Sequence, residues 1–324
     1  MTQAIRFHQT GGPEVLKLET TEVGNPGPGQ ARIRHTAIGV NYIDTYHRSG
    51  LYSVPLPSGL GLEGAGVVEA VGEGVDWVRL GDRVAYCGGA LGSYADVRLL
   101  AADRLVRIPD GVTDEAAATL MLKGLTVQYL FRQTRPLHAG DTILFHAAAG
   151  GVGLIACQWA RALGVTMIGT VGSDAKAELA RSHGCAHTIV YTRENFVERV
   201  KAITGGRGVP VVYDSIGKDT FPASLDCLQP RGMYVLFGAA SGPVPPFDIG
   251  ILAQKGSLYA TRPTLFTYAA TRAELTAMAD EMFGLVRDGK IVSEPRQRFA
   301  LRDAAGAHIA LEARGTVGAT ILVP

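Results

Sequence analysis

Apolar and polar residues alternate over short stretches in the first third of the chain, and glycine or proline separates most of these stretches. Examples are residues 4–9 (AIRFHQ), 31–40 (ARIRHTAIGV) and 82–88 (DRVAYCG). Alternation with a period of two is typical of strands that bury one face. Residues 1 to about 110 are therefore expected to form an all-β module, with a barrel as its expected shape.

The pattern changes at Thr113. Residues 113–131 (TDEAAATLMLKGLTVQYLF) favour a helix, and short apolar runs then alternate with helical segments to about residue 260. Residues 141–147 (DTILFHA) and 165–171 (VTMIGTV) are two of these runs. Strands that alternate with helices indicate a parallel sheet with crossover helices, a doubly wound Rossmann fold. The last segment, 318–324 (GATILVP), is expected to be a strand that returns to the first module.

Composition excludes several classes of protein. With 324 residues, 47% of them hydrophobic and 19% charged, the chain is long enough for a large core and two domains. The formal net charge of +1 argues against nucleic acid as a partner. No basic, apolar leader precedes the first strand and no apolar run reaches the length of a membrane span, so we expect no membrane association. The four cysteines are widely spaced, which fits a reducing compartment and predicts the cytoplasm.

A glycine-rich turn follows the first strand of the alternating region. Ala148, Gly150 and Gly153 match the GxGxxG pattern with alanine in the first place, and a segment of helical periodicity follows. Gly150 allows the backbone to approach a pyrophosphate, and the helix N-terminus offers free amides and positive dipole charge. The alternative is a strand-to-helix turn without a ligand. The order of strand, loop, helix and second strand favours a dinucleotide.

The end of the next strand indicates which dinucleotide. NAD enzymes of this fold usually carry an acidic residue there, which binds the ribose hydroxyls. This chain has Gly172 and Ser173, followed by Lys176, which suits a 2′-phosphate and predicts NADPH. Asp174 is at odds with this interpretation unless it caps the following helix. Lys176 has the alternative of being an ordinary solvated lysine of that helix.

Several motifs together resemble the medium-chain dehydrogenase/reductase superfamily: residues 37–52 (AIGVNYIDTYHRSGLY), 57–72, 81–86, 147–164, 211–217 and 254–265. Within it the chain is similar to the bacterial NADPH:quinone oxidoreductases, which are related to zeta-crystallin. The resemblance runs nearly end to end. It implies a GroES-like β-barrel catalytic domain (residues 1–120), a Rossmann NADPH-binding domain (121–262) and a C-terminal return that completes the catalytic domain (263–324). It also implies a homodimer joined through the edges of the nucleotide domains.

The resemblance also implies residue roles. Asn41 and Tyr46, with Tyr52 as a weaker candidate, would line the acceptor pocket beside the nicotinamide. The dinucleotide would contact Tyr42, Ile43, Asp44, Thr45, Thr126, Gly151, Val152, Ser215, Phe237, Gly238, Arg262, Pro263, Thr264 and Leu265. Lys176, Tyr191 and Arg314 match positions that surround the 2′-phosphate in these enzymes. The sequence alone also allows structural roles for both residues. Asn41 could hydrogen-bond the backbone of a turn, and Tyr46 could be a partly exposed amphipathic side chain, with neither of them catalytic.

The chain departs from the zinc alcohol dehydrogenases at two positions. Where those relatives have cysteine and histidine as zinc ligands, this chain has Asn41 and Leu62, and leucine cannot bind a metal. The cysteine cluster of their structural zinc is also missing, so we expect no metal. Glu63 is interpreted as a buried remnant of the metal shell, without a chemical role.

A hydride acceptor without a Lewis acid must itself be electrophilic. Quinones and α,β-unsaturated carbonyls meet this requirement, because they delocalise the negative charge. The sequence therefore predicts an enzyme, an NADPH-dependent quinone reductase in which Asn41 and Tyr46 hydrogen-bond the acceptor oxygen. Transfer of a hydride and transfer of single electrons both remain open. The alternatives are an NADPH-dependent alkenal or enone reductase and a non-catalytic NADPH-binding structural or RNA-binding protein.

Overall fold

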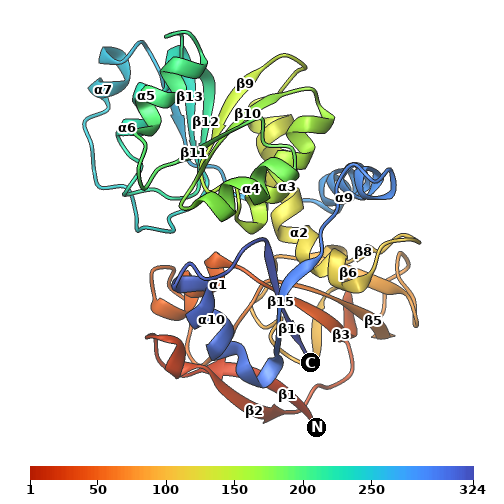
Figure 1. Ribbon diagram of the computed structural model, residues 1–324. Helices are drawn as coiled ribbons and strands as arrows, with labels where there is room; N and C mark the ends of the chain where they lie inside the picture. Colours follow the sequence, from red (N-terminus) through yellow and green to blue (C-terminus); the bar gives the residue numbers. More distant parts are fainter. The chain divides into compact units, whose positions relative to one another are not determined.

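The computed structural model describes residues 1–324, which divide into two compact units (Figure 1). Unit 1 comprises Met1–Leu125 and Ala269–Pro324, and unit 2 comprises Thr126–Tyr268. The chain therefore leaves its first unit, forms the second, and returns. It first passes between the units within one helix, α2 (Asp114–Tyr129).

Unit 1 is built mainly from strands. A three-stranded sheet has the order β2-β1-β4, and a larger sheet has the order β15-β16-β3-β5-β6-β8, with β7 paired to β3. These strands are β1 (Thr2–Phe7), β2 (Lys17–Thr21), β3 (Gln30–Val40), β4 (Ser58–Gly59), β5 (Glu63–Val71), β6 (Arg83–Cys87), β7 (Val97–Ala101), β8 (Val106–Arg107), β15 (Pro295–Ala300) and β16 (Ala319–Val323). The last strand pairs antiparallel with β3, with Thr320 opposite Val40, so both ends of the chain contribute to this unit.

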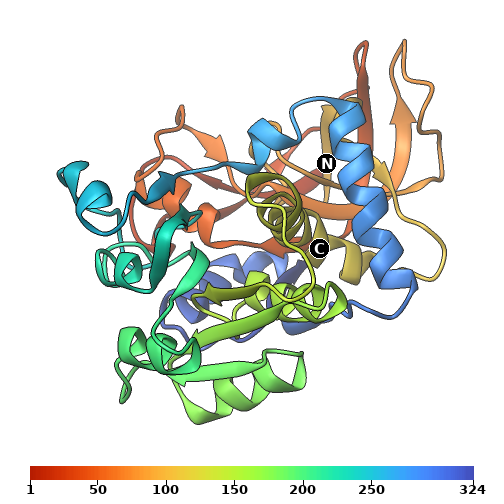
Figure 2. The same ribbon diagram turned by 90° about the horizontal axis from the view of Figure 1, so that it is seen from above.

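The helices of unit 1 include α2 and three others: α1 (Tyr42–Ser49), α9 (Arg272–Arg287) and α10 (Ala304–Glu312). Short 3-10 helices span Pro13–Val15, Ala102–Arg104 and Leu301–Asp303. Helix α9 lies beside α2 (Figure 2), and a Cβ on Gly124 would come within 2.4 Å of the Met282 sulfur. Glycine at 124 therefore permits the close approach of these two helices.

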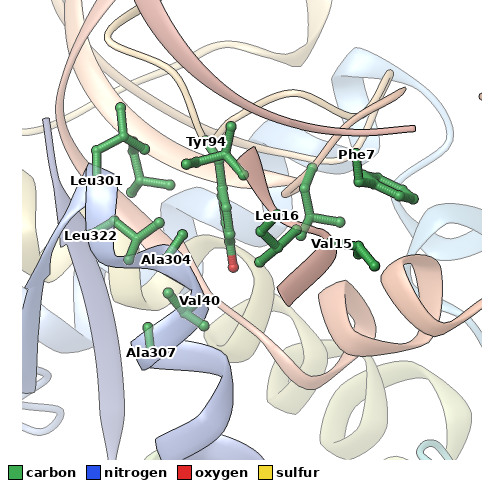
Figure 3. Close-up of a cluster of buried hydrophobic side chains, with 12 residues drawn as sticks. Phe7, Val15, Leu16, Val40, Tyr94, Leu301, Ala304, Ala307 and Leu322 are labelled. Carbon is green, nitrogen blue, oxygen red and sulfur yellow. The ribbon is translucent and has the colours of Figure 1, made fainter. Parts of the chain in front are cut away.

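One apolar cluster of unit 1 joins its two chain segments (Figure 3). Phe7, Val40 and Tyr94 come from the N-terminal part, and Leu301 and Ala304 come from the C-terminal part. All five are nearly or completely inaccessible to solvent. Burial of this surface stabilises the return of the chain to the first unit.

Unit 2 contains a six-stranded sheet in which every neighbouring pair is parallel. Its strand order is β11-β10-β9-β12-β13-β14, that is 3-2-1-4-5-6 in order of appearance. The strands are β9 (Thr142–Phe145), β10 (Thr166–Val171), β11 (His187–Val190), β12 (Val209–Asp214), β13 (Leu228–Leu236) and β14 (Tyr259–Thr261). This is the order of a doubly wound Rossmann sheet, which confirms the predicted fold class.

Helices cover both faces of this sheet (Figure 1). They are α3 (Gly151–Ala162), α4 (Asp174–Ser182), α5 (Phe196–Ile203), α6 (Ala223–Asp226), α7 (Gly250–Gln254) and α8 (Leu265–Tyr268), and a π-helical turn spans Leu130–Thr134. Leu144 and Val212 of the sheet pack against Val200 of α5 and Leu225 of α6. None of the helices in either unit combines the length and hydrophobicity needed to cross a bilayer.

Candidate functional site

The sequence-predicted residues of unit 2 gather at one edge of the parallel sheet. Gly150 lies in the loop after β9, Gly172 directly follows β10, and Tyr191 directly follows β11. On the other half of the sheet, Ser215 follows β12, Phe237 and Gly238 follow β13, and Arg262, Pro263, Thr264 and Leu265 follow β14. In doubly wound sheets the carboxyl ends of the strands form the ligand crevice, above all where the strand order reverses. Here the reversal lies between β9 and β12.

The glycine turn opens helix α3 without a side-chain cap. Gly150 is the N-cap in an extended conformation (φ −78°, ψ 174°), and no side chain bonds the first-turn amides. A Cβ on Gly153 would lie 2.3 Å from the Ala147 carbonyl oxygen, so glycine is required there for loop and helix to pack. A Cβ on Gly150 would lie 3.2 Å from the same oxygen. An uncapped helix N-terminus with bare backbone before it fits a pyrophosphate.

A set of mostly polar residues lies after the carboxyl ends of strands β10 and β11. Ser173 caps α4 by accepting a hydrogen bond from the backbone N–H of Lys176 at 3.3 Å. The Tyr191 hydroxyl lies over Gly172, since a Cβ on that glycine would be 3.0 Å from it. The structure thus brings together Gly172, Ser173, Lys176 and Tyr191, four residues proposed for the 2′-phosphate.

Asp174, the residue at odds with NADPH, has a partner that the sequence did not indicate. The Arg193 guanidinium donates to both carboxylate oxygens at 2.5 Å. This pairing lowers the pKa of Asp174 below its usual value. Asp174 is therefore held as a carboxylate whose charge is offset by arginine, and it is Ser173 that caps α4.

Beyond β12, a buried carboxylate holds the loop that carries Ser215. Asp214 Oδ1 accepts from the N–H groups of Ile216 and Gly217, at 2.7 and 3.2 Å. Its Oδ2 accepts from the hydroxyls of Thr220 and Tyr234, at 2.6 and 2.9 Å. With four donors, the loop after β12 has a single preferred conformation.

The predicted acceptor residues of unit 1 surround helix α1. Asn41 directly follows β3 and is the N-cap of the helix, and its backbone N–H donates to Asp44 Oδ2 at 2.8 Å. The Tyr46 ring makes an edge contact with the Tyr52 ring, with centroids 5.3 Å apart. Tyr42 lies one helical turn before Tyr46, with ring centroids 6.3 Å apart. The three tyrosines therefore form one half-buried aromatic cluster beside Asn41.

The other predicted residues of unit 1 lie on α1 and after α10. Ile43 is half-buried, whereas Asp44 and Thr45 are buried. Arg314 follows α10 with a positive φ of 57°, and its charge acts on Tyr42, whose pKa burial raises. Thr126, the first residue of unit 2, is 7% exposed on α2.

The Asn41 side chain is bonded to a buried ionic pair. Its Nδ2 donates to Glu63 Oε2 at 2.8 Å, and Glu63 is inaccessible to solvent. Lys123 Nζ donates to the same oxygen at 3.2 Å, and the Leu122 backbone N–H donates to Oε1 at 2.6 Å. Glu63 is buried as expected, and it hydrogen-bonds the Asn41 side chain, a contact that the sequence did not indicate.

A chain of buried hydrogen bonds leads away from the same place. Asp44 Oδ2 also accepts from the Tyr94 hydroxyl at 2.9 Å, and that hydroxyl lies 3.1 Å from His308 Nε2. His308 Nδ1 accepts from Arg48, which is paired with Glu312 at 2.7 Å. Burial raises the pKa of Asp44 to about 7. Burial, and then the Arg48 charge, lower the pKa of His308 to about 3.

Comparison with known proteins identifies the family. The model of the alcohol dehydrogenase GroES-like domain matches residues 27–110, and that of the zinc-binding dehydrogenases matches residues 151–282. The chain is 59% identical to a quinone oxidoreductase of Pseudomonas aeruginosa, with all of both chains covered. It is 50% identical to the Escherichia coli quinone oxidoreductase solved in complex with NADPH, with 99% of this chain and 100% of that one covered and a TM-score of 0.98. A 2-haloacrylate reductase of a Burkholderia species is 48% identical over 100% of this chain and 99% of its own length.

The chain belongs to the quinone oxidoreductase family. This confirms the resemblance found in the sequence, including the GroES-like and nucleotide-binding parts of the medium-chain dehydrogenase/reductase superfamily. In this member of the quinone oxidoreductases, Leu62 is 4% exposed and offers no ligand atom. The nearby Cys87 is buried, and burial raises the pKa of its thiol. No three His, Cys, Asp or Glu side chains are grouped so that they could hold a metal ion.

Three residues around the sites of this quinone oxidoreductase, Lys123, Arg193 and Asp214, were not predicted from the sequence. Lys123 lies within the LKGLT motif, yet its partner Glu63 is 60 residues earlier in the chain. Arg193 follows β11 by a few residues and pairs with Asp174 across the sheet edge. Asp214 stands in the YDSIG motif, and an acidic residue before a small one at a strand end is a signal for such a turn.

Proposed function

We propose that this protein reduces quinones with NADPH and without a metal ion. The observation that carries the proposal is the full-length relationship to proteins named quinone oxidoreductase. The carboxyl edge of the unit 2 sheet and the polar surroundings of α1 in unit 1 provide the two kinds of site that this reaction needs.

The residues of unit 2 bind and orient the cofactor. The uncapped N-terminus of α3 and Gly150 hold the pyrophosphate, with Gly151 and Val152 beside it. Ser173, Lys176 and Tyr191 hold the 2′-phosphate. Ser215 and residues 262–265 hold the remaining parts of the dinucleotide. Bound NADPH supplies a hydride from C4 of its nicotinamide.

The residues of unit 1 bind the acceptor. Asn41 offers an amide N–H and Tyr46 a hydroxyl to the acceptor oxygen on which negative charge develops, and the Tyr52 ring packs against Tyr46. The proton of the reduced product comes from water, so neither side chain has to act as an acid. We expect loss of either donor to slow the reaction about ten- to a thousandfold.

The class of acceptor follows from Asn41 and Leu62, the side chains at the two positions where zinc alcohol dehydrogenases have zinc ligands. Leu62 cannot polarise a carbonyl group, and Asn41 offers only one N–H, because Glu63 accepts the other. A plain ketone would gain only two hydrogen bonds, whereas a quinone delocalises the charge in its own ring. Electrophilic acceptors are therefore the substrates that this site serves.

The experiment that tests this function is NADPH oxidation, followed by absorbance, with 1,4-benzoquinone and 9,10-phenanthrenequinone as acceptors. We expect turnover with both quinones, a marked preference for NADPH over NADH, and a lower rate for Tyr46→Phe with unchanged affinity for NADPH. Absence of turnover with every quinone would contradict the proposal.

The second candidate function is reduction of activated alkenes. The 48% identical 2-haloacrylate reductase supports it. Because the same donors would stabilise an enolate, the two functions differ only in the acceptor. Measuring kcat/KM for 2-haloacrylate and 2-alkenals beside the quinones separates them: higher values for the alkenes would replace the first proposal by the second.

We also propose a homodimer in the cytoplasm. The four cysteines are free and buried, which supports a reducing compartment. Strand β14 is the outer strand of the parallel sheet, and its Tyr259 is 58% exposed, which supports pairing of two copies along this edge. Light scattering after gel filtration tests the dimer, and binding assays with RNA at low salt test the expected lack of nucleic-acid binding.

A further inference from the structure

Glu63 is completely buried and surrounded by hydrogen-bond donors. The Leu122 backbone N–H reaches Oε1 at 2.6 Å, while Asn41 Nδ2 and Lys123 Nζ reach Oε2 at 2.8 and 3.2 Å. These donors come from two places far apart in the chain: the residue after β3, and two adjacent residues of α2. A carboxylate only accepts hydrogen bonds, whereas a neutral amide or a hydroxyl also carries a donor. Three surrounding donors therefore match a carboxylate at this position.

The space for this carboxylate is created by a glycine. A Cβ on Gly39 would lie 2.2 Å from Glu63 Oε2 and 2.3 Å from the Ala118 carbonyl oxygen of α2. Strand β3 and helix α2 therefore approach each other closely at this point, and the Glu63 side chain fills the gap between them.

Glu63, together with the capping box of α1, determines which way the Asn41 amide faces. The oxygen and nitrogen of an asparagine amide have similar shapes, so packing alone does not distinguish the two orientations. A carboxylate next to the amide does, because it accepts from nitrogen and repels oxygen. The Asn41 backbone is fixed as well, through its N–H bond to Asp44. One of the two Nδ2 hydrogens is used by Glu63, and the second remains for another acceptor.

Lys123 compensates the charge of Glu63. Its side chain is 6% exposed, so the ammonium and the carboxylate form a buried pair. Without the ammonium, a full negative charge would lie one hydrogen bond away from an amide that has to donate to a developing oxyanion. With it, the amide is oriented and the net charge beside it is zero.

We propose that Glu63 and Lys123 are positioning residues for the reaction. Glu63 holds the Asn41 amide so that its second N–H is offered to the acceptor oxygen, and Lys123 cancels the carboxylate charge. This inference rests on the role of Asn41 in the proposed function.

The experiment is a double-mutant cycle on the rate of hydride transfer, measured in a single turnover with 1,4-benzoquinone. In Glu63→Gln, a neutral amide replaces the carboxylate opposite the three donors. The Asn41 side-chain amide can then flip, so that its oxygen takes the place of its nitrogen. We expect this variant to be at least about tenfold slower, with an unchanged Kd for NADPH. In the Asn41→Ala background, the same substitution should change the rate less than about twofold, because there is no amide left to position.

The lysine provides a second, independent test. We expect Lys123→Met to slow hydride transfer at least about fivefold and Lys123→Arg to retain most of the wild-type rate, because arginine keeps the charge. These two lysine variants still test the proposal if Glu63→Gln does not fold. Glu115→Gln, which breaks an exposed ion pair with Arg298, is the control and should leave the rate unchanged.

The outcomes distinguish the role of Asn41 as a donor from the positioning role of Glu63 and Lys123. If Asn41→Ala leaves the rate unchanged, the role of Asn41 in the proposed function is wrong, and the positioning role is wrong with it. If Asn41→Ala slows the reaction while Glu63→Gln slows it by the same factor in both backgrounds, only the positioning role is wrong. Equal rates for Lys123→Met and Lys123→Arg would likewise contradict the role of the lysine charge.

Discussion

Arg48 donates a hydrogen bond of 3.1 Å to Nδ1 of His308, and both side chains are buried. Because arginine only donates, His308 is neutral and carries its proton on Nε2. That N–H donates to the Tyr94 oxygen, and the Tyr94 hydroxyl donates in turn to Asp44. The hydrogen bonds therefore run in one direction, from Arg48 near the end of α1 through His308 of α10 and Tyr94 to Asp44 near the start of α1.

The first prediction concerns stability in acid. The pKa of His308 is about 3 in the folded protein and 6.5 in an exposed histidine, so below pH 6.5 the unfolded chain binds a proton that the folded chain does not. Stability is therefore lost as the pH falls, by about 2 kcal/mol from this residue at pH 5. We expect His308→Gln to lose about 2 kcal/mol less than the wild type between pH 7 and pH 5 in urea unfolding. An identical loss would contradict the buried neutral state.

Asp44 gives a prediction of opposite sign. Burial raises its pKa to about 7, against 3.8 for an exposed aspartate, while hydrogen bonds from Asn41 and Tyr94 partly oppose this shift. The folded form thus holds the proton more tightly, and this contribution to stability is lost as the pH rises from about 4 to about 7. In Asp44→Asn, a neutral amide replaces the carboxyl, and its nitrogen can take the place of the unpartnered Oδ1.

We therefore expect the wild type to lose about 3 kcal/mol relative to Asp44→Asn between pH 5 and pH 8. Urea unfolding of both proteins at the two pH values measures this difference. Parallel stability curves for the two proteins would show that Asp44 does not bind its proton in this pH range.

Alanine substitution of the two glycines in the α3 turn should have different effects: Gly153→Ala on stability and Gly150→Ala on NADPH binding. Alanine at 153 would bring its Cβ to 2.3 Å from the Ala147 oxygen and 2.6 Å from Ala148 backbone, so we expect a loss of stability of about 2 kcal/mol or more. Alanine at 150 meets only one atom, at 3.2 Å, and the φ of −78° suits it. Gly150→Ala should therefore fold normally and bind NADPH more weakly. Thermal melting and NADPH fluorescence titration of both variants check this; a normal NADPH affinity in Gly150→Ala would exclude the loop from the pyrophosphate site.

Arg193 should affect the choice between the two nicotinamide cofactors. Its removal exposes the charge of Asp174 next to Ser173 and Lys176, where the 2′-phosphate is proposed to bind. We expect Arg193→Ala to raise the Kd of NADPH about fivefold and to leave that of NADH nearly unchanged. The double variant Asp174→Ala/Arg193→Ala should recover the NADPH affinity.

A matched control for Arg193 lies on helix α4, which begins with Asp174. Arg181 forms an exposed ion pair with Glu178 at 2.8 Å, one turn apart on α4. Arg181→Ala removes an equal charge from this helix and should leave both affinities unchanged. If it weakens NADPH binding as much as Arg193→Ala does, the effect is one of general charge and Asp174 is not involved.

The sequence predicted those features whose cause is local. The alternation of strands and helices specified the parallel sheet, and residues that follow the strands, such as Gly150, Gly172 and Ser215, necessarily meet at one edge. Leu62 was sufficient to exclude a metal ligand at its position. The same local reasoning identified Asn41 only with the help of the family resemblance.

The features that escaped prediction depend on contacts between distant segments. Glu63 meets Lys123 because β3 approaches α2 closely at Gly39 and the Glu63 side chain of β5 lies between them, and no periodicity of the sequence specifies that contact. Asp174 resembled an obstacle to NADPH until its pairing with Arg193, 19 residues later, was seen. Ion pairs across a fold follow from its topology, and a single sequence does not show which charges meet.

Metal-free reduction of electrophilic acceptors is tested by comparing two reactions of one chelator-treated sample. We expect NADPH oxidation by 1,4-benzoquinone to keep its full rate after dialysis against EDTA, and NADP⁺ with ethanol to show no turnover. A quinone rate that disappears with EDTA and returns with zinc, or rapid oxidation of ethanol, would contradict it.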